Sequence, residues 1–165
     1  MDMIDRLFGH DRGMTNHYLE LCRNLTDEQW DREFDVGMHT LRRSFDHMNE
    51  AVDFWMGWMT GVPNQRELEY KTWDQLVGEH RSGYDRFETF ARQVIADGRL
   101  DETFEYHWKV RHSYGASILP VILHNQTHRT EILHMLHGLG LDDLPEGDPQ
   151  EWEWELRETG VLPPA

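Results

Sequence analysis

Cysteine, basic charge and long apolar runs are all scarce in this sequence. The single cysteine, Cys22, cannot form an internal disulfide, and its place in an apolar pattern between Leu21 and Leu25 indicates a buried thiol rather than a nucleophile. Only 16 lysines and arginines stand against 31 acidic residues, and the net charge of -15 repels polyanions, so nucleic acid is not an expected partner. No apolar run has the length of a signal peptide or a membrane span, so we expect a cytoplasmic protein without a membrane partner.

The apolar content is nevertheless high enough for a folded protein. Hydrophobic residues make up 38% and aromatic residues 12% of the 165 positions, which is more apolar bulk than disordered chains carry. Because a chain of this length can enclose one core, we expect a single domain over residues 1–165. Residues 142–165 form an acidic segment that contains Trp152 and Trp154, and we expect this tail to pack on the domain.

Helical periodicity dominates the sequence. Apolar residues recur at three- and four-residue steps in four stretches, which is the pattern of helices with one buried face. The stretches run from near the N-terminus to about residue 24, and then over residues 40–60, 72–97 and 117–138. Four long helices of this kind predict an all-α four-helix bundle, a fold that builds metal and ligand sites from side chains on facing helices.

Shorter signals lie between these stretches. Thr26 with Gln29 and Thr72 with Gln75 have the spacing of capping boxes, so we expect a short helical turn after Thr26 and a helix start after Thr72. A loop is expected around Gly37 before the second long helix. The next signal is T-F-E-Y-H-W-K-V at residues 103–110, a period-two pattern that fits a short extended strand or an irregular loop, and we interpret it as extended.

The stretch L-H-N-Q-T-H-R places His124 and His128 four residues apart in the last predicted helix. At about 100° per residue, His124 and four apolar residues of that helix fall within roughly 40° of His128, whereas His134 and His137 fall more than roughly 90° away. The four are Val121, Ile132, Met135 and Leu139. The pair therefore shares the stripe that faces the core, where two uncompensated imidazoles cost free energy and a divalent cation would remove that cost. The alternative is a chance spacing among 11 histidines, with rings that merely pack or hydrogen-bond in the core.

A third ligand is needed to hold such an ion, and His47 in the second long helix is the candidate. It stands in D-H-M-N-E, and small residues on its side of the helix, such as Ser44 and Ala51, leave space for a bound group. Imidazole nitrogen is a common ligand of zinc, nickel, copper and iron. Three protein ligands with an open position are typical of a catalytic metal, which keeps a place for water or substrate.

Two segments stand out together: F-D-H-M-N-E-A-V-D-F-W at residues 45–55 and H-N-Q-T-H-R-T-E-I-L-H-M-L at residues 124–136. In this combination the sequence resembles the DinB family of damage-inducible proteins and their thiol-transferase relatives. The resemblance implies an up-down-down-up four-helix bundle with a long crossover connection, commonly assembled as a homodimer. It also implies that His47, His124 and His128 hold a divalent metal ion, often nickel or zinc.

An enzyme of the thiol S-transferase type is the function that the resemblance implies. Such an enzyme activates a low-molecular-weight thiol, for example mycothiol, bacillithiol or glutathione, at its metal for reaction with a small-molecule substrate. A metal-dependent hydrolase, which activates water in the same way, is one alternative. A non-catalytic metal- or ligand-binding protein of a stress response is another, and in a third the histidines only pack within a dimerisation module.

Glu131 is the candidate catalytic residue. It lies roughly 60° from His128 on the helical wheel, close enough to accept a hydrogen bond from that ring or to act as a base. The alternative is an ordinary solvated helix carboxylate. The negative field of the chain disfavours a highly anionic substrate unless the pocket is locally basic. The candidates for basic side chains at the pocket are Arg42, Arg43, Arg111 and Arg129.

Overall fold

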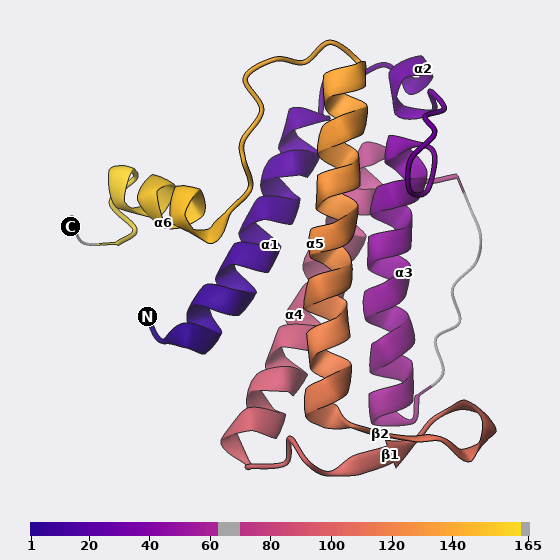
Figure 1. The fold of residues 1–165 in the computed structure, drawn as a ribbon, viewed down its shortest axis with the longest axis vertical. Helices are drawn as coiled ribbons and strands as arrows, with labels where there is room; N and C mark the ends of the chain where they lie inside the picture. Colours follow the sequence, from indigo (N-terminus) through magenta and orange to yellow (C-terminus); the bar gives the residue numbers. More distant parts are fainter. Residues whose placement is uncertain (63–69, 163–165) are drawn as a thin grey trace.

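Four long helices form the body of the protein in its computed structural model, which describes residues 1–62 and 70–162 (Figure 1). They are α1 (Met3–Leu21), α3 (Leu41–Thr60), α4 (Trp73–Ala96) and α5 (Tyr114–Gly138). Helices α1 and α5 run in one direction and α3 and α4 in the other, which confirms the predicted up-down-down-up bundle. Helix α4 begins at the same end of the bundle as α3, as a long crossover connection requires; residues 63–69 of that connection lie outside the described residues.

Each long helix packs against two of the others, since α1 and α3 both contact α4 and α5. Buried apolar side chains fill the space between them in two clusters, one around Phe45 and Ile132 and one around Phe87 and Val121. Helix α5 contributes to both clusters. The helix that carries two of the three predicted ligands therefore packs against both clusters.

Capping side chains fix where the helices begin. Both predicted capping boxes are present, with Thr26 at the start of α2 (Asp27–Trp30) and Thr72 at the start of α4. The hydroxyl of Thr40 accepts a hydrogen bond from the third backbone N–H of α3 at 3.1 Å, which satisfies one of the free donors of a helix start. This cap sets the first residue of the helix that carries His47.

The expected extended segment over residues 103–110 is wrong in its second half. Strand β1 (Thr103–Glu105) pairs antiparallel with β2 (Arg111–Ser113), and the 3-10 turn η1 (His107–Lys109) reverses the chain between them. Trp108 and the residue after it have positive φ values of 55° and 63°. Turns of this kind usually contain Asn-Gly or another glycine pair, and Trp-Lys gives no such signal, so the pattern alone did not reveal the reversal.

Helix α5 begins earlier than expected, at Tyr114 rather than near Ser117. The side chain of Ser113 caps it by accepting a hydrogen bond from the N–H of Ala116 at 3.2 Å. Pro120 favours a helix start close before it because proline suits the first turn. In this protein it lies inside the helix instead, where its missing N–H leaves one carbonyl of the preceding turn without its helical donor.

The acidic tail contains a further helix, α6 (Pro149–Glu158), capped by Asp148. Its Trp152 is buried against α1, where two glycines leave room for the indole. A Cβ added at Gly9 would stand 2.8 Å from the Trp152 ring, and one at Gly13 would stand 2.6 Å from its Nε1 atom. The helix therefore packs on the bundle through a close indole–backbone contact.

Candidate metal centre

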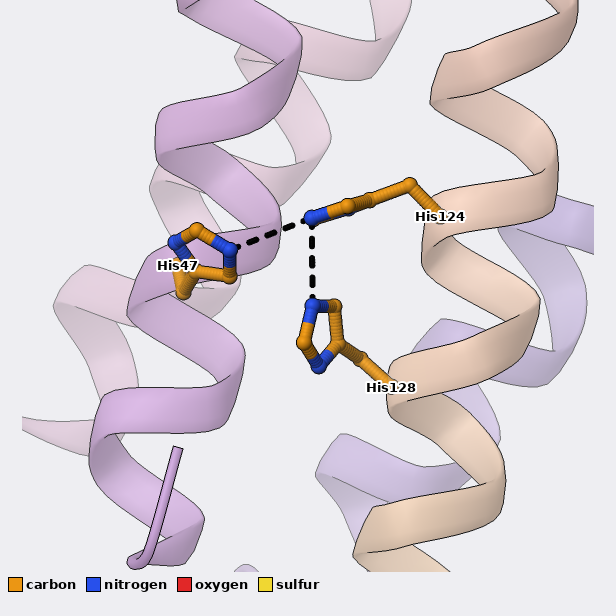
Figure 2. A group of neighbouring side chains, drawn as sticks. All are labelled: His47, His124 and His128. Carbon is orange, nitrogen blue, oxygen red and sulfur yellow. Dashed lines mark hydrogen bonds between the residues drawn. The ribbon is translucent and has the colours of Figure 1, made fainter. Parts of the chain in front are cut away.

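The three predicted ligands come together between α3 and α5, as Figure 2 shows. His47 projects from α3 toward α5, and His124 and His128 project toward it from successive turns of α5. A spacing of four residues puts the two α5 rings above one another on one face of the helix. Two helices that are far apart in the sequence thus bring three imidazoles to one point.

The Nε2 atoms of these rings converge. Nε2 of His124 lies 3.1 Å from Nε2 of His47 and 3.1 Å from Nε2 of His128, and the ligand nitrogens all lie within 4.8 Å of one another. With zinc–nitrogen bonds of about 2.0–2.1 Å, tetrahedral ligands stand about 3.3 Å apart. The rings therefore have close to the mutual spacing of a metal site, and a set of three imidazoles fits a divalent ion such as zinc or nickel.

Two of the rings also meet a carboxylate through their other nitrogen. Nδ1 of His128 lies 2.6 Å from Oε2 of Glu131, and Nδ1 of His47 lies 3.5 Å from Oε2 of Glu50. A carboxylate at Nδ1 holds a proton on that nitrogen and leaves the Nε2 lone pair for a metal. Sequence reasoning considered Glu131 but missed Glu50, although both stand three residues after a histidine in the pattern His-x-x-Glu.

The number of protons available to this group explains why it favours a cation. With the Nδ1 protons held by the carboxylates, Nε2 of His47 and Nε2 of His128 can only accept, and a neutral His124 has a single proton to offer. If His124 donates through Nε2, it satisfies one neighbour, and the lone pair of the other neighbour faces a nitrogen whose single proton points elsewhere. If His124 carries its proton on Nδ1 instead, acceptors face each other at both 3.1 Å contacts. A cation bound between the rings removes this conflict because it attracts all three lone pairs.

Burial favours the neutral form of the rings. Desolvation, together with a smaller electrostatic effect of the neighbouring histidines, lowers the pKa of His124 to about 4, and the same causes lower the pKa of His47. Neutral imidazole is the form that binds a metal ion. Near pH 7 these two ligands therefore need not lose a proton before they bind.

Sequence reasoning missed a second polar cluster directly beside the ligands. The guanidinium of Arg129 donates to the carboxylate of Asp11 and, at 3.1 Å, to the hydroxyl of Thr15, and both charged side chains are at most 1% exposed. Tyr84 and Asn125 each donate to Oδ2 of Asp11 at 2.9 Å. Two features of the sequence could have indicated this cluster. Asp11 stands within the apolar stripe of the first helix, and Asn125 and Arg129 form a second pair with four-residue spacing on α5. Arg129 is thus engaged in the core rather than available to a substrate.

The other side chains considered from the sequence lie away from the convergence point or are already engaged. His134 and His137 are exposed, as the helical wheel predicts. The remaining candidate arginines have polar partners, since Arg42 binds Asp27 and Asp31, Arg43 binds Asp46 and Glu50, and Arg111 binds Thr103. The centre is therefore a group of imidazoles backed by carboxylates, a surrounding that disfavours a highly anionic substrate.

Comparison with known proteins points to one family. The sequence model of the DinB superfamily matches residues 11–132. The matched segment contains His47, His124 and His128 together with both glutamates of the centre, and it ends before α6. No curated protein matches the chain. Within residues 1–62 and 70–162, none of the helices combines the length and the apolar character needed to cross a membrane.

Proposed function

Because the chain belongs to the DinB superfamily, we propose that it binds a divalent metal ion through Nε2 of His47, His124 and His128 and acts as a metal-dependent thiol S-transferase. The observation that carries the proposal is the pair of 3.1 Å contacts between Nε2 atoms, which have too few protons to satisfy one another. Such a group of lone pairs is stabilised by a cation.

The metal, when bound, supplies a lowered pKa for a coordinated thiol, so that a thiolate exists near neutral pH. Three protein ligands leave a coordination position for that thiol. Zinc and nickel are the ions we propose, since imidazole nitrogen suits both. The partners of the protein are then a low-molecular-weight thiol and a small electrophilic substrate that the thiolate attacks.

The position of Glu131 favours transfer to a thiol over hydrolysis. Its Oε2 atom accepts from Nδ1 of His128 at 2.6 Å, so the carboxylate is engaged in orienting a ligand. A hydrolase of this kind benefits from a carboxylate that takes a proton from the attacking water. We therefore assign to Glu131 the role of holding the His128 ring in place, rather than the role of catalytic base.

Metal analysis of untagged protein after incubation with zinc or nickel tests the binding step. We expect roughly one equivalent per chain in the wild type and far less in His128→Ala, because two ligands hold such an ion poorly. His137→Ala is the matched control, since it removes an exposed histidine from the same helix, and it should bind as much metal as the wild type. Less than about a tenth of an equivalent in the wild type would refute the metal site.

Thiol transfer to a chromogenic electrophile, assayed with several low-molecular-weight thiols, tests the catalytic step. We expect turnover in the wild type and in His137→Ala and its loss in His128→Ala, since only the last variant removes a ligand. Equal rates in the wild type and His128→Ala would remove the catalytic assignment for that reaction while leaving the metal-binding result intact. The two experiments therefore separate an enzyme from a protein that only binds metal.

We also propose that the protein forms a homodimer. Trp108 at the hairpin tip is 90% exposed and Trp154 on α6 is 62% exposed. Large exposed aromatic side chains are enriched at protein interfaces. Sedimentation at micromolar concentration should reveal a species of about twice the chain mass of 19.7 kDa. A single species at the chain mass would contradict the proposal.

A further inference from the structure

Gly37, in the loop between α2 and α3, lies directly against the carboxylate of Glu131. Its backbone has a φ of +52°, in the left-handed region that favours glycine. A Cβ at this position would stand 2.1 Å from Oε2 and 2.5 Å from Cδ of Glu131. Gly140 also has a positive φ, +85°, but among the described residues nothing lies within 4 Å of a Cβ added there. The close approach to a carboxylate thus separates Gly37 from a glycine that serves only a turn.

The same oxygen of Glu131 meets both Gly37 and His128. Oε2 lies 2.6 Å from Nδ1 of His128 and is also the atom that a Cβ at residue 37 would strike. We propose that Gly37 is a positioning residue of the metal centre, an inference that rests on the proposed metal site. Because Gly37 has no side chain, the carboxylate reaches Nδ1 of His128, keeps the proton there and leaves Nε2 facing the other two ligands.

The loop is held in place, so it does not readily withdraw from a new side chain. The N–H of Phe34 donates to the carbonyl of His39 at 2.8 Å, and the N–H of His39 donates to the carbonyl of Val36 at 3.0 Å. The Phe34 ring also packs against α5 so closely that a Cβ at Gly138 would stand 2.7 Å from it. The end of a glutamate side chain rotates far more easily than this loop moves. A side chain at residue 37 therefore displaces the carboxylate and breaks its bond to His128.

The tautomer of His128 in metal-free protein tests this inference without depending on metal binding. Nitrogen-15 shifts of the ring, correlated with its carbon-bound protons, show which nitrogen carries the proton. The variant is Gly37→Asn, because asparagine adopts positive φ more easily than other side chains and so adds the Cβ with little backbone strain. We expect protonated Nδ1 in the wild type and in the control Gly140→Asn, and mixed tautomers in Gly37→Asn and Glu131→Ala.

An unchanged His128 tautomer in Gly37→Asn, or the same change in Gly140→Asn, would overturn the inference.

Metal affinity, measured by competition with a chromophoric chelator, is the second readout. Partners that orient a ligand typically contribute about 10–100-fold in affinity, so we expect a loss of that order in Gly37→Asn and none in Gly140→Asn. In a Glu131→Ala background, Gly37→Asn should cause little further loss, and fully additive losses would contradict the mechanism. A wild type that binds no metal refutes the proposed function, whereas the tautomer test still decides the role of Gly37.

Discussion

Helix α5 carries two polar pairs with the same four-residue spacing. One is His124 with His128, and the other, shifted by one residue along the helix, is Asn125 with Arg129. Arg129 and Asn125 meet the carboxylate of Asp11, so a cation faces an anion and charge is balanced within the core. Nε2 of His124 lies 3.1 Å from Nε2 of both His47 and His128, and the three rings have too few protons to satisfy both contacts. One spacing on one helix thus builds a cluster that is balanced by itself and another that favours a bound cation.

The two clusters should therefore contribute to stability in different ways. The Asp11 cluster comprises Asp11, Thr15, Tyr84, Asn125 and Arg129, and the histidine cluster comprises His47, His124 and His128. Breaking a buried charged pair leaves an uncompensated charge whether or not metal is present. A ligand that binds only the folded protein adds stability in proportion to its affinity and concentration. The Asp11 cluster should therefore stabilise the protein in all conditions, and the histidine cluster only when metal is bound.

Asp11→Ala should have the largest effect of any change that tests this contrast. It leaves the guanidinium of Arg129, which is 1% exposed, without its anion, and removal of one partner of a buried pair costs about 3–5 kcal/mol. Urea unfolding with and without zinc measures the free energy of unfolding. We expect the same loss in both conditions, because the variant leaves the three histidines of the proposed metal site in place.

A double variant checks the cause of that loss. Asp11→Asn combined with Arg129→Met removes both charges at similar volume, and replacing a buried pair by uncharged groups is often close to neutral. It should therefore recover much of the stability lost in Asp11→Ala. A loss below about 1 kcal/mol in Asp11→Ala, in the range of exposed ion pairs, would show that the cluster is not a buried, charge-balanced unit.

His80, which packs against Tyr84 of the Asp11 cluster, should make the stability of the protein depend on pH. It packs against Tyr84 with ring centroids 5.6 Å apart, it is 3% exposed, and desolvation lowers its pKa from 6.5 to about 4. Below about pH 6.5 the unfolded chain takes up a proton that the folded protein does not, so the free energy of unfolding falls by about 3 kcal/mol as the pH drops toward 4. Stability curves between pH 7 and pH 4 should be flatter for His80→Leu than for the wild type, with or without a chelator. Parallel curves would show that His80 does not titrate in this window.

The two clusters also show which parts of the structure can be predicted from the sequence and which cannot. The four helices, both capping boxes and the faces of His124 and His137 follow from local periodicity and spacing, and the observed helices and burial agree. The pairing of Arg129 with Asp11 joins residues 118 positions apart, and no local pattern encodes it. The contact of Gly37 with Glu131 depends on the path of an irregular loop. The hairpin was missed for a related reason, since Trp-Lys is not a usual turn sequence.

Removal of metal should lower stability only through the histidine cluster. At a free metal concentration of about 100 times Kd, binding adds about 2.7 kcal/mol to the free energy of unfolding. A chelator should lower the free energy of unfolding by the same amount in the wild type and in Asp11→Ala. It should not change the free energy of unfolding of His124→Ala. Thermal unfolding of the three proteins with and without chelator measures the difference. A chelator effect of equal size in His124→Ala would place the metal elsewhere.

The smallest effect is expected from removing either of the two carboxylates that contact the histidine cluster. Glu131 lies 2.6 Å from Nδ1 of His128, whereas Glu50 lies 3.5 Å from Nδ1 of His47 and also binds Arg43 at 3.0 Å. Loss of an orienting partner costs about 10–100-fold in metal affinity, and we expect Glu131→Ala to reach that range while Glu50→Ala falls below it. Competition titrations with zinc measure both, with Glu158→Ala as an exposed control on α6. An equal or larger loss in Glu50→Ala would mean that charge near the site, rather than a short bond to one ring, sets the metal affinity.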